Sequence, residues 1–178
     1  VTVTGATWGS QGRTFDGNDL INVGNVPQLD DAQADLTIAL WLKTTATGNK
    51  AIIFYDNDNA LAPNVDWYVY FPNNLRFGGL GDVNEYSTST GFHDDIPHLL
   101  AITKSGGTIT CFKDGVSFYS VVTANNHADF NSTFTLRLGD DANVSFFSGS
   151  MGEFWLYNRA LTAGEVMQKY LSTKFRYP

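Results

Sequence analysis

The sequence predicts an all-β protein, a two-sheet antiparallel sandwich with one short helix near its C-terminal end. Strand-like segments recur every 8 to 15 residues, and Asn, Gly, Asp and Pro residues separate them. Apolar and polar residues alternate within these segments, as expected of strands with one face on a core. The last third of the chain leaves an apolar strand, passes a turn and enters a helical segment. A chain of 178 residues can form a single domain of this class, so we expect one domain over residues 1–178.

Several strands are predicted with defined bounds. The segment 36–43 places Leu36, Ile38, Leu40 and Leu42 on one face, which we assign to the core, and Trp41 on a mixed face. Trp41 could pack under a loop or be exposed. The predicted inner strands are residues 51–55, 66–71, 74–78, 99–103, 108–113, 116–122, 134–138 and 152–157.

Turns and a helix cap complete the predicted pattern. Residues 105–107 and 113–115 are rich in glycine and are predicted to be hairpin connections. Thr162 and Glu165 have the spacing of a capping box, which predicts a helix over residues 163–171. Residues 1–11 are predicted to form an extended strand or arm.

Composition and charge limit the possible partners. Hydrophobic residues make up 43% of the chain and charged residues only 16%, which indicates a globular protein. The formal net charge of −7 would repel phosphate backbones and anionic lipids. We therefore expect no nucleic acid partner. No apolar run approaches the ~20 residues of a membrane-spanning helix, so no membrane insertion is expected.

The single cysteine, Cys111, excludes an internal disulfide. It lies in an alternating strand and is predicted to be a buried or half-buried small apolar residue, not a reactive thiol. The sequence starts at Val1, and no signal peptide is visible in it, so it has the features of a mature product or an excised module.

Several segments in a fixed order share one resemblance. They are GRTFDGND at 12–19, DLTIALWLK at 35–43, HLLAITK at 98–104, TITCFKDG at 108–115, LRLG at 136–139 and GSMGEFWLYNRALTAGEV at 149–166. Together they resemble the laminin-G-like, concanavalin A-like lectin and glucanase family over roughly residues 12–171. The resemblance implies a jelly-roll sandwich.

The resemblance also implies a structural Ca²⁺ ion near the first and last strands. The residues that match the family's positions are Asp16 and Asp19 in the first turn and Glu153 in the closing strand. Calcium requires six to eight oxygen ligands, which carboxylates and carbonyls supply. Three other acidic groups, at residues 55–59, 94–95 and 140–141, are interpreted as solvated loops.

Some relatives of this class hydrolyse glycosidic bonds with two carboxylates held close together. The chain has only three glutamates, Glu85, Glu153 and Glu165, and none has a second carboxylate two or four positions away. His98, at the start of a strand, is interpreted as a packed, hydrogen-bonded histidine. We therefore predict that the chain is not an enzyme.

A candidate ligand face contains Tyr68, Tyr70, Arg76 and Tyr86. Aromatic rings stack on the apolar faces of sugars, and planar polar groups bind hydroxyls. In segment 66–71, Tyr68 and Tyr70 alternate with Trp67, Val69 and Phe71, which we assign to the core. The same tyrosines could instead be ordinary strand residues.

The function predicted from these observations is non-catalytic recognition of a glycan or a protein surface, within a larger extracellular or particle-surface assembly. The first alternative is a structural viral protein, such as a capsid decoration, fibre or adhesin subunit, in which the N-terminal strand adds to a neighbour. That alternative favours a homo-oligomer. The second alternative is a glycoside hydrolase. The localisation expected is extracellular, or on a virion or cell surface.

Overall fold

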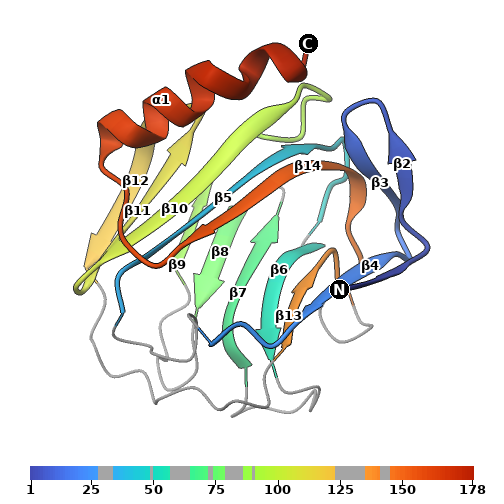
Figure 1. The fold of residues 1–178 in the computed structure, drawn as a ribbon, viewed down its shortest axis with the longest axis horizontal. Coiled ribbons are helices and arrows are strands. Elements are labelled where there is room, and N and C mark those ends of the chain that lie inside the picture. The colour runs from blue at the N-terminus through green and yellow to red at the C-terminus, as the bar shows by residue number, and fades with distance from the viewer. Residues whose placement is uncertain are drawn as a thin grey trace.

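The computed structural model confirms a two-sheet antiparallel sandwich with one short C-terminal helix (Figure 1). It describes residues 1–27, 34–48, 50–56, 65–71, 74–78, 86–89, 91–122, 135–140 and 145–178. The first sheet contains, in spatial order, β1 (Thr2–Thr4), β4 (Leu20–Gly24), β13 (Thr135–Leu138), β6 (Lys50–Asp56), β7 (Val65–Phe71), β8 (Asn74–Gly78) and β9 (Tyr86–Ser89). The second sheet contains β12 (Val116–Val122), β11 (Thr108–Lys113), β10 (His98–Ser105), β5 (Leu36–Lys43), β14 (Ser148–Tyr157), β3 (Gly12–Asp16) and β2 (Thr7–Gly9).

The main core lies between the two sheets, as the alternating pattern predicts. Ile38, Leu40 and Leu42 of β5 are buried in it, together with Val69 of β7. Cys111 is also fully buried there, and burial raises the pKa of its thiol to about 12. The thiol is therefore protonated and unreactive at neutral pH, as predicted.

A second core lies on the opposite face of the second sheet, beneath helix α1 (Ala163–Thr173) (Figure 1). Trp41 is only 2% exposed there, and its indole N–H donates to the Thr173 hydroxyl oxygen at 2.9 Å. Ala39 and Ala101 have small side chains, which let the helix approach the sheet. Trp41 therefore packs under the C-terminal helix, a position that the sequence left open between a covering loop and solvent.

The helix begins at the predicted capping box. The Thr162 side chain accepts the Glu165 N–H, and the Glu165 carboxylate accepts the Thr162 N–H at 2.8 Å. The helix extends two residues beyond the predicted end and continues as the short 3₁₀ helix η2 (Lys174–Arg176). Hairpin turns occur at both predicted positions. Asp114 and Gly115 both have positive φ, as a two-residue turn between β11 and β12 requires.

The structure corrects two details of the predicted strands. Segment 116–122 was predicted as an inner strand, but β12 forms an edge of the second sheet. Residues 1–11 contain two strands, and neither extends away from the domain: β1 pairs with β4 in the first sheet and β2 with β3 in the second. No helix in the described part of the chain is long and apolar enough to span a membrane.

Candidate functional site

The predicted ligand residues lie on three neighbouring strands of the first sheet. In the backbone register, Tyr70 of β7 is opposite Arg76 of β8, and Arg76 is opposite Ser87 of β9. These three residues form one row across the sheet, which we call the Tyr70 row. Tyr68 lies two positions along β7, opposite Gly78. Tyr86 is opposite Phe77, one register position away from the row. The register therefore brings Tyr70 and Arg76 together and places Tyr86 in the adjacent position.

The two sheets differ in what covers them. Helix α1 lies along the second sheet, on the side away from β6, β7 and β8 (Figure 1). Among the described elements, no helix covers the first sheet. The Tyr70 row thus belongs to the sheet that the C-terminal helix leaves uncovered.

Of the predicted metal residues, Asp16 is the last residue of β3, and Asp19 lies in the turn that follows it. The Asp16 N–H donates to the Asp19 carboxylate at 2.8 Å, and the Asn18 N–H donates to the Asp16 carboxylate at 3.3 Å. Asp19 is only 4% exposed. Gly5 has positive φ, and a Cβ atom at this residue would collide with the Asp19 carboxylate, so only glycine fits against the turn. The two carboxylates are held close together by the backbone.

The third predicted metal residue, Glu153, lies elsewhere on the second sheet. Asp16 pairs with Ser148, so Glu153 is five residues further along β14. Its carboxylate pairs with Arg176, and its backbone N–H donates to the Tyr177 hydroxyl oxygen at 2.8 Å. Within the described residues, no group of three or more Asp, Glu, His or Cys side chains is arranged to hold a metal ion. Asp16 and Asp19 are thus brought together, and Glu153 is separate from them.

His98 lies between two carboxylates. Its Nδ1 is 2.6 Å from the Asp114 carboxylate, and its Nε2 is 3.1 Å from Asp94. Burial by itself would lower the pKa of His98, but the hydrogen bonds to Asp114 and Asp94 outweigh burial and raise it above 6.5. His98 is thus a packed, hydrogen-bonded residue, as predicted, and it ties the segment before β10 to the β11–β12 turn.

The other acidic groups have different outcomes. Asp94 contacts His98, and Asp95 pairs with Lys43 at 3.4 Å. Asp140 was assigned to a solvated loop, but this is wrong: it is fully buried and lies 3.5 Å from Arg137. A buried carboxylate needs such a partner because burial disfavours charge. Residues 57–59 and Asp141 lie outside the described residues.

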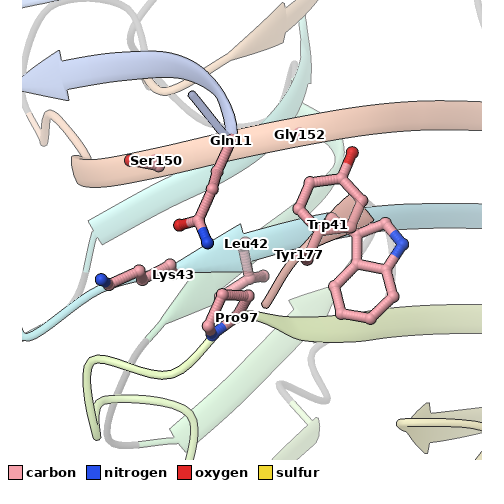
Figure 2. A pocket seen from close by; sticks show the side chains of 8 residues that line it. All are labelled: Gln11, Trp41, Leu42, Lys43, Pro97, Ser150, Gly152 and Tyr177. Atoms are coloured by element: carbon pink, nitrogen blue, oxygen red, sulfur yellow. The ribbon is translucent and has the colours of Figure 1, made fainter. Parts of the chain in front are cut away.

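A shallow hollow lies where the C-terminus crosses the second sheet, lined by Gln11, Trp41, Leu42, Lys43, Pro97, Ser150, Gly152 and Tyr177 (Figure 2). It encloses no space that could hold a ligand, because its lining residues leave only a surface depression. Two of its polar side chains have partners within the protein, since Gln11 donates to the Pro178 carbonyl oxygen and Lys43 pairs with Asp95. We assign the hollow to packing of the C-terminal segment.

The exposed aromatic residue Trp8 was not predicted as a site residue from the sequence. Trp8 is 76% exposed on the edge strand β2, and the Arg13 guanidinium lies 4.0 Å from the centre of its ring. The signal available in the sequence was a tryptophan one residue before a Gly9–Gly12 hairpin. That pattern is short, and only the sheet order shows that β2 is an edge strand.

The fold and these sites define the class of protein: a jelly-roll β-sandwich whose candidate binding residues lie on its sheets and turns. The chain belongs to the concanavalin A-like lectin/glucanases superfamily, whose family model matches residues 15–167. No curated protein sequence matches the chain.

Solved structures with the same fold include several binding domains. The carbohydrate-binding module CBM40 of the Ruminococcus gnavus IT-sialidase, solved with α2,3-sialyllactose, has a TM-score of 0.69 and 14% identity, over 90% of this chain and 96% of that one. Domain 4 of AbnA, an extracellular arabinanase from Geobacillus stearothermophilus solved with arabinotriose, has a TM-score of 0.66 and 17% identity, over 94% and 81%. The binding domain of Paraclostridial Mosquitocidal Protein 1 has a TM-score of 0.67 and 16% identity, over 96% of this chain. The chain spans only 45% of that domain's length.

Proposed function

We propose that this chain is a non-catalytic glycan-binding module that acts as part of a larger extracellular or surface-exposed protein. The observation that carries the proposal is the pairing of Tyr70 with Arg76 on the sheet that α1 leaves uncovered. A tyrosine ring supplies a flat apolar surface for a pyranose, and a guanidinium donates several hydrogen bonds in a fixed plane. Ser87 adds a hydroxyl group in the same row.

The solved structures of the same fold support this choice of ligand class. Two of them contain oligosaccharides, sialyllactose and arabinotriose. A third concerns botulinum neurotoxin type C, whose cell entry depends on two ganglioside molecules. The AbnA domain belongs to an extracellular enzyme, which supports an extracellular location for the present chain.

The non-catalytic part of the proposal is supported by the glutamates. Glu153 pairs with Arg176, and Glu165 pairs with Arg159 at 2.7 Å. Arg159, with the Thr162 N–H, lowers the pKa of Glu165 to about 2, so this group cannot act as a general acid at neutral pH. The remaining glutamate, Glu85, lies outside the described residues.

A glycan array tests the proposal, followed by titration calorimetry with the best ligand. We expect saturable binding by the wild type, and about tenfold weaker binding by Tyr70→Ala and by Arg76→Ala, since one aromatic stack or charged hydrogen bond contributes ~1–2 kcal/mol. Phe175→Ala is the control, because Phe175 is 72% exposed at the C-terminus. The absence of any glycan ligand, or hydrolysis of a polysaccharide by the wild type, would contradict the proposal.

One observation favours an assembly role as the second candidate. The edge strand β12 has two exposed valines, Val116 at 60% and Val122 at 75%. An edge strand with apolar side chains can pair with another chain. Light scattering separates the candidates: a stable oligomer without glycan binding would favour assembly, whereas a monomer that binds glycan would favour the module.

A further inference from the structure

Trp8 is an unusually exposed tryptophan for a folded domain. It lies on β2, at the edge of the second sheet, and is 76% exposed. By contrast, Trp41 is buried and Trp155 packs partly buried against the second core. Burial of a large aromatic side chain stabilises a folded protein, and an exposed ring forgoes that stabilisation. The stability of the fold therefore does not explain why a tryptophan is exposed at this position.

Arg13 holds the Trp8 ring in place. Its guanidinium lies 4.0 Å from the ring centre, and its Nη1 donates to the Ala6 carbonyl oxygen at 3.0 Å. In the described part of the chain, no carboxylate forms an ion pair with Arg13. Arg176 makes the contrast clear, since it lies 5.5 Å from the Phe175 ring centre but pairs with Glu153. The Arg13 guanidinium thus stays free to stack on the indole.

The hairpin that carries both residues is firmly attached to the domain. Trp8 and Arg13 are directly opposite each other in the register of β2 and β3. Gly12 has positive φ, and a Cβ atom there would collide with the Met151 carbonyl oxygen, so the hairpin lies tight against β14. At the hairpin tip, Gln11 donates to the Pro178 carbonyl oxygen at 3.0 Å. A ligand would meet a ring whose orientation is already fixed, which lowers the entropic cost of binding.

The surroundings of Trp8 fit a sugar ring better than a protein partner. Thr7, Gly9, Ser10 and Thr14 are all exposed beside it, so the aromatic surface has a small, polar rim. One indole offers at most ~250 Å², whereas a stable protein interface buries ~800 Å² per partner. A pyranose has one apolar face and a rim of hydroxyl groups, which matches this surface. The net charge of −7 disfavours a polyanionic glycan.

We propose that Trp8 is a second glycan contact, which stacks its open face on a neutral pyranose, with Arg13 as the positioning residue. This inference rests on the proposed function but concerns a different sheet from the Tyr70 row. A polysaccharide long enough to contact both Trp8 and the Tyr70 row would bind more tightly than at either site alone. The reason is that its second contact forms within the same complex, at a high effective concentration.

The test measures binding of soluble neutral polysaccharides (arabinan, xylan, mixed-linkage β-glucan and galactomannan) to the wild type, Trp8→Ala, Arg13→Ala, Tyr70→Ala and the control Phe175→Ala. We expect Trp8→Ala to weaken binding about tenfold and Phe175→Ala to change it less than about twofold. Circular dichroism confirms folding of each variant.

Acrylamide quenching of tryptophan fluorescence gives a second measurement. In the wild type, bound polysaccharide should reduce quenching, and Trp8→Phe should lack that reduction. In the Arg13→Ala variant without ligand, acrylamide should quench the tryptophan fluorescence more strongly, because Arg13 no longer holds the Trp8 indole.

The outcomes separate the two proposals. If the wild type binds and Trp8→Ala binds equally well, the Trp8 inference is overturned while the proposed function stands. If Trp8→Ala loses binding and Tyr70→Ala does not, Trp8 is supported and the assignment of the Tyr70 row fails. If the wild type binds none of these polysaccharides and no glycan on the array, both proposals are overturned.

Discussion

The phenol ring of Tyr177 lies flat on the indole of Trp41, with ring centroids 4.5 Å apart and an interplanar angle of 18°. Trp41 is on the central strand β5, and Tyr177 is the penultimate residue of the chain. Tyr170 stacks on the same indole with a centroid distance of 5.8 Å. The C-terminal segment thus covers the second core, and both of its tyrosines pack on the Trp41 indole.

Loss of the Tyr177 ring should destabilise the domain. We expect Tyr177→Ala to lower the free energy of unfolding by about 2 kcal/mol, because it removes an aromatic stack and exposes the indole. Urea denaturation followed by tryptophan fluorescence measures the change. Phe175→Ala should change it by less than about 0.5 kcal/mol, since its ring is 72% exposed. Equal effects of the two variants would contradict the role of the stack.

Gly152 is predicted to be essential for this packing. A Cβ atom at Gly152 would collide with the Tyr177 ring and hydroxyl group, which lie directly over β14. Gly152→Ala should therefore displace Tyr177, lower Tm and reduce the near-UV circular dichroism of the aromatic cluster. Gly164→Ala is a suitable control because a Cβ atom there meets nothing closer than 3.9 Å. An unchanged Tm and near-UV spectrum in Gly152→Ala would contradict this prediction, because Tyr177 would then still be stacked on Trp41.

The His98 cluster predicts a stability that depends on pH. Because the pKa of His98 is raised in the folded state, its stabilising contribution is complete below its ordinary pKa of 6.5 and is lost as pH rises through the folded value. Burial would raise the pKa of Asp94, but its hydrogen bonds with His98 and the Ile96 N–H outweigh burial and lower it. Asp94 therefore stabilises the fold fully above its ordinary pKa of 3.8, and this stabilisation is lost only at more acidic pH. Lys113 is the nearby cation, and it opposes protonation of His98.

The measurement is urea denaturation at about pH 5.5 and pH 8.5 for the wild type and His98→Gln. The wild type should lose stability at the higher pH, and the variant should lose less, because its side chain carries no charge. The same loss in both proteins would place the pH dependence elsewhere.

The helix cap predicts a smaller effect. Thr162→Ala removes the side chain that accepts the Glu165 N–H, and we expect a loss of about 1 kcal/mol. The pKa of Glu165 is lowered from 4.5 to about 2, so its contribution is complete above 4.5 and is lost only as pH falls toward that lower value. Thermal denaturation at neutral pH measures the loss of stability expected for Thr162→Ala. Thr162→Ser should retain most of the stability, since serine keeps the hydroxyl group.

Calcium binding remains a prediction, now limited to the turn with Asp16 and Asp19. If these carboxylates bind Ca²⁺, millimolar calcium should raise the Tm of protein first stripped with chelator, through linkage of binding to folding. Asp16→Asn should abolish the shift, and Glu153→Gln should leave it unchanged because Glu153 pairs with Arg176. No shift in the wild type would refute the site.

Much of the fold was predictable from local patterns. The bounds of β8, β11 and β12 match the predicted segments, and the capping box and the Asp114–Gly115 turn occur as expected. Such features depend on residues a few positions apart, so the sequence displays them directly. The candidate site was less predictable. Tyr70 and Arg76 could be named as residue types, but only the register shows that they are opposite each other.

Local propensity and alternation were enough to predict most of the strands, the start of the helix and the burial of Cys111, but not β4 and β9, which fall outside the predicted segments. Other features became visible only in the folded domain: Trp41 lies beneath the C-terminal segment, Asp140 is buried, Glu153 is separate from Asp16, and Trp8 is on an exposed edge strand. These features depend on the order of strands in each sheet and on which sheet face is covered, and both are set by contacts between segments far apart in the chain. No local pattern encodes those contacts.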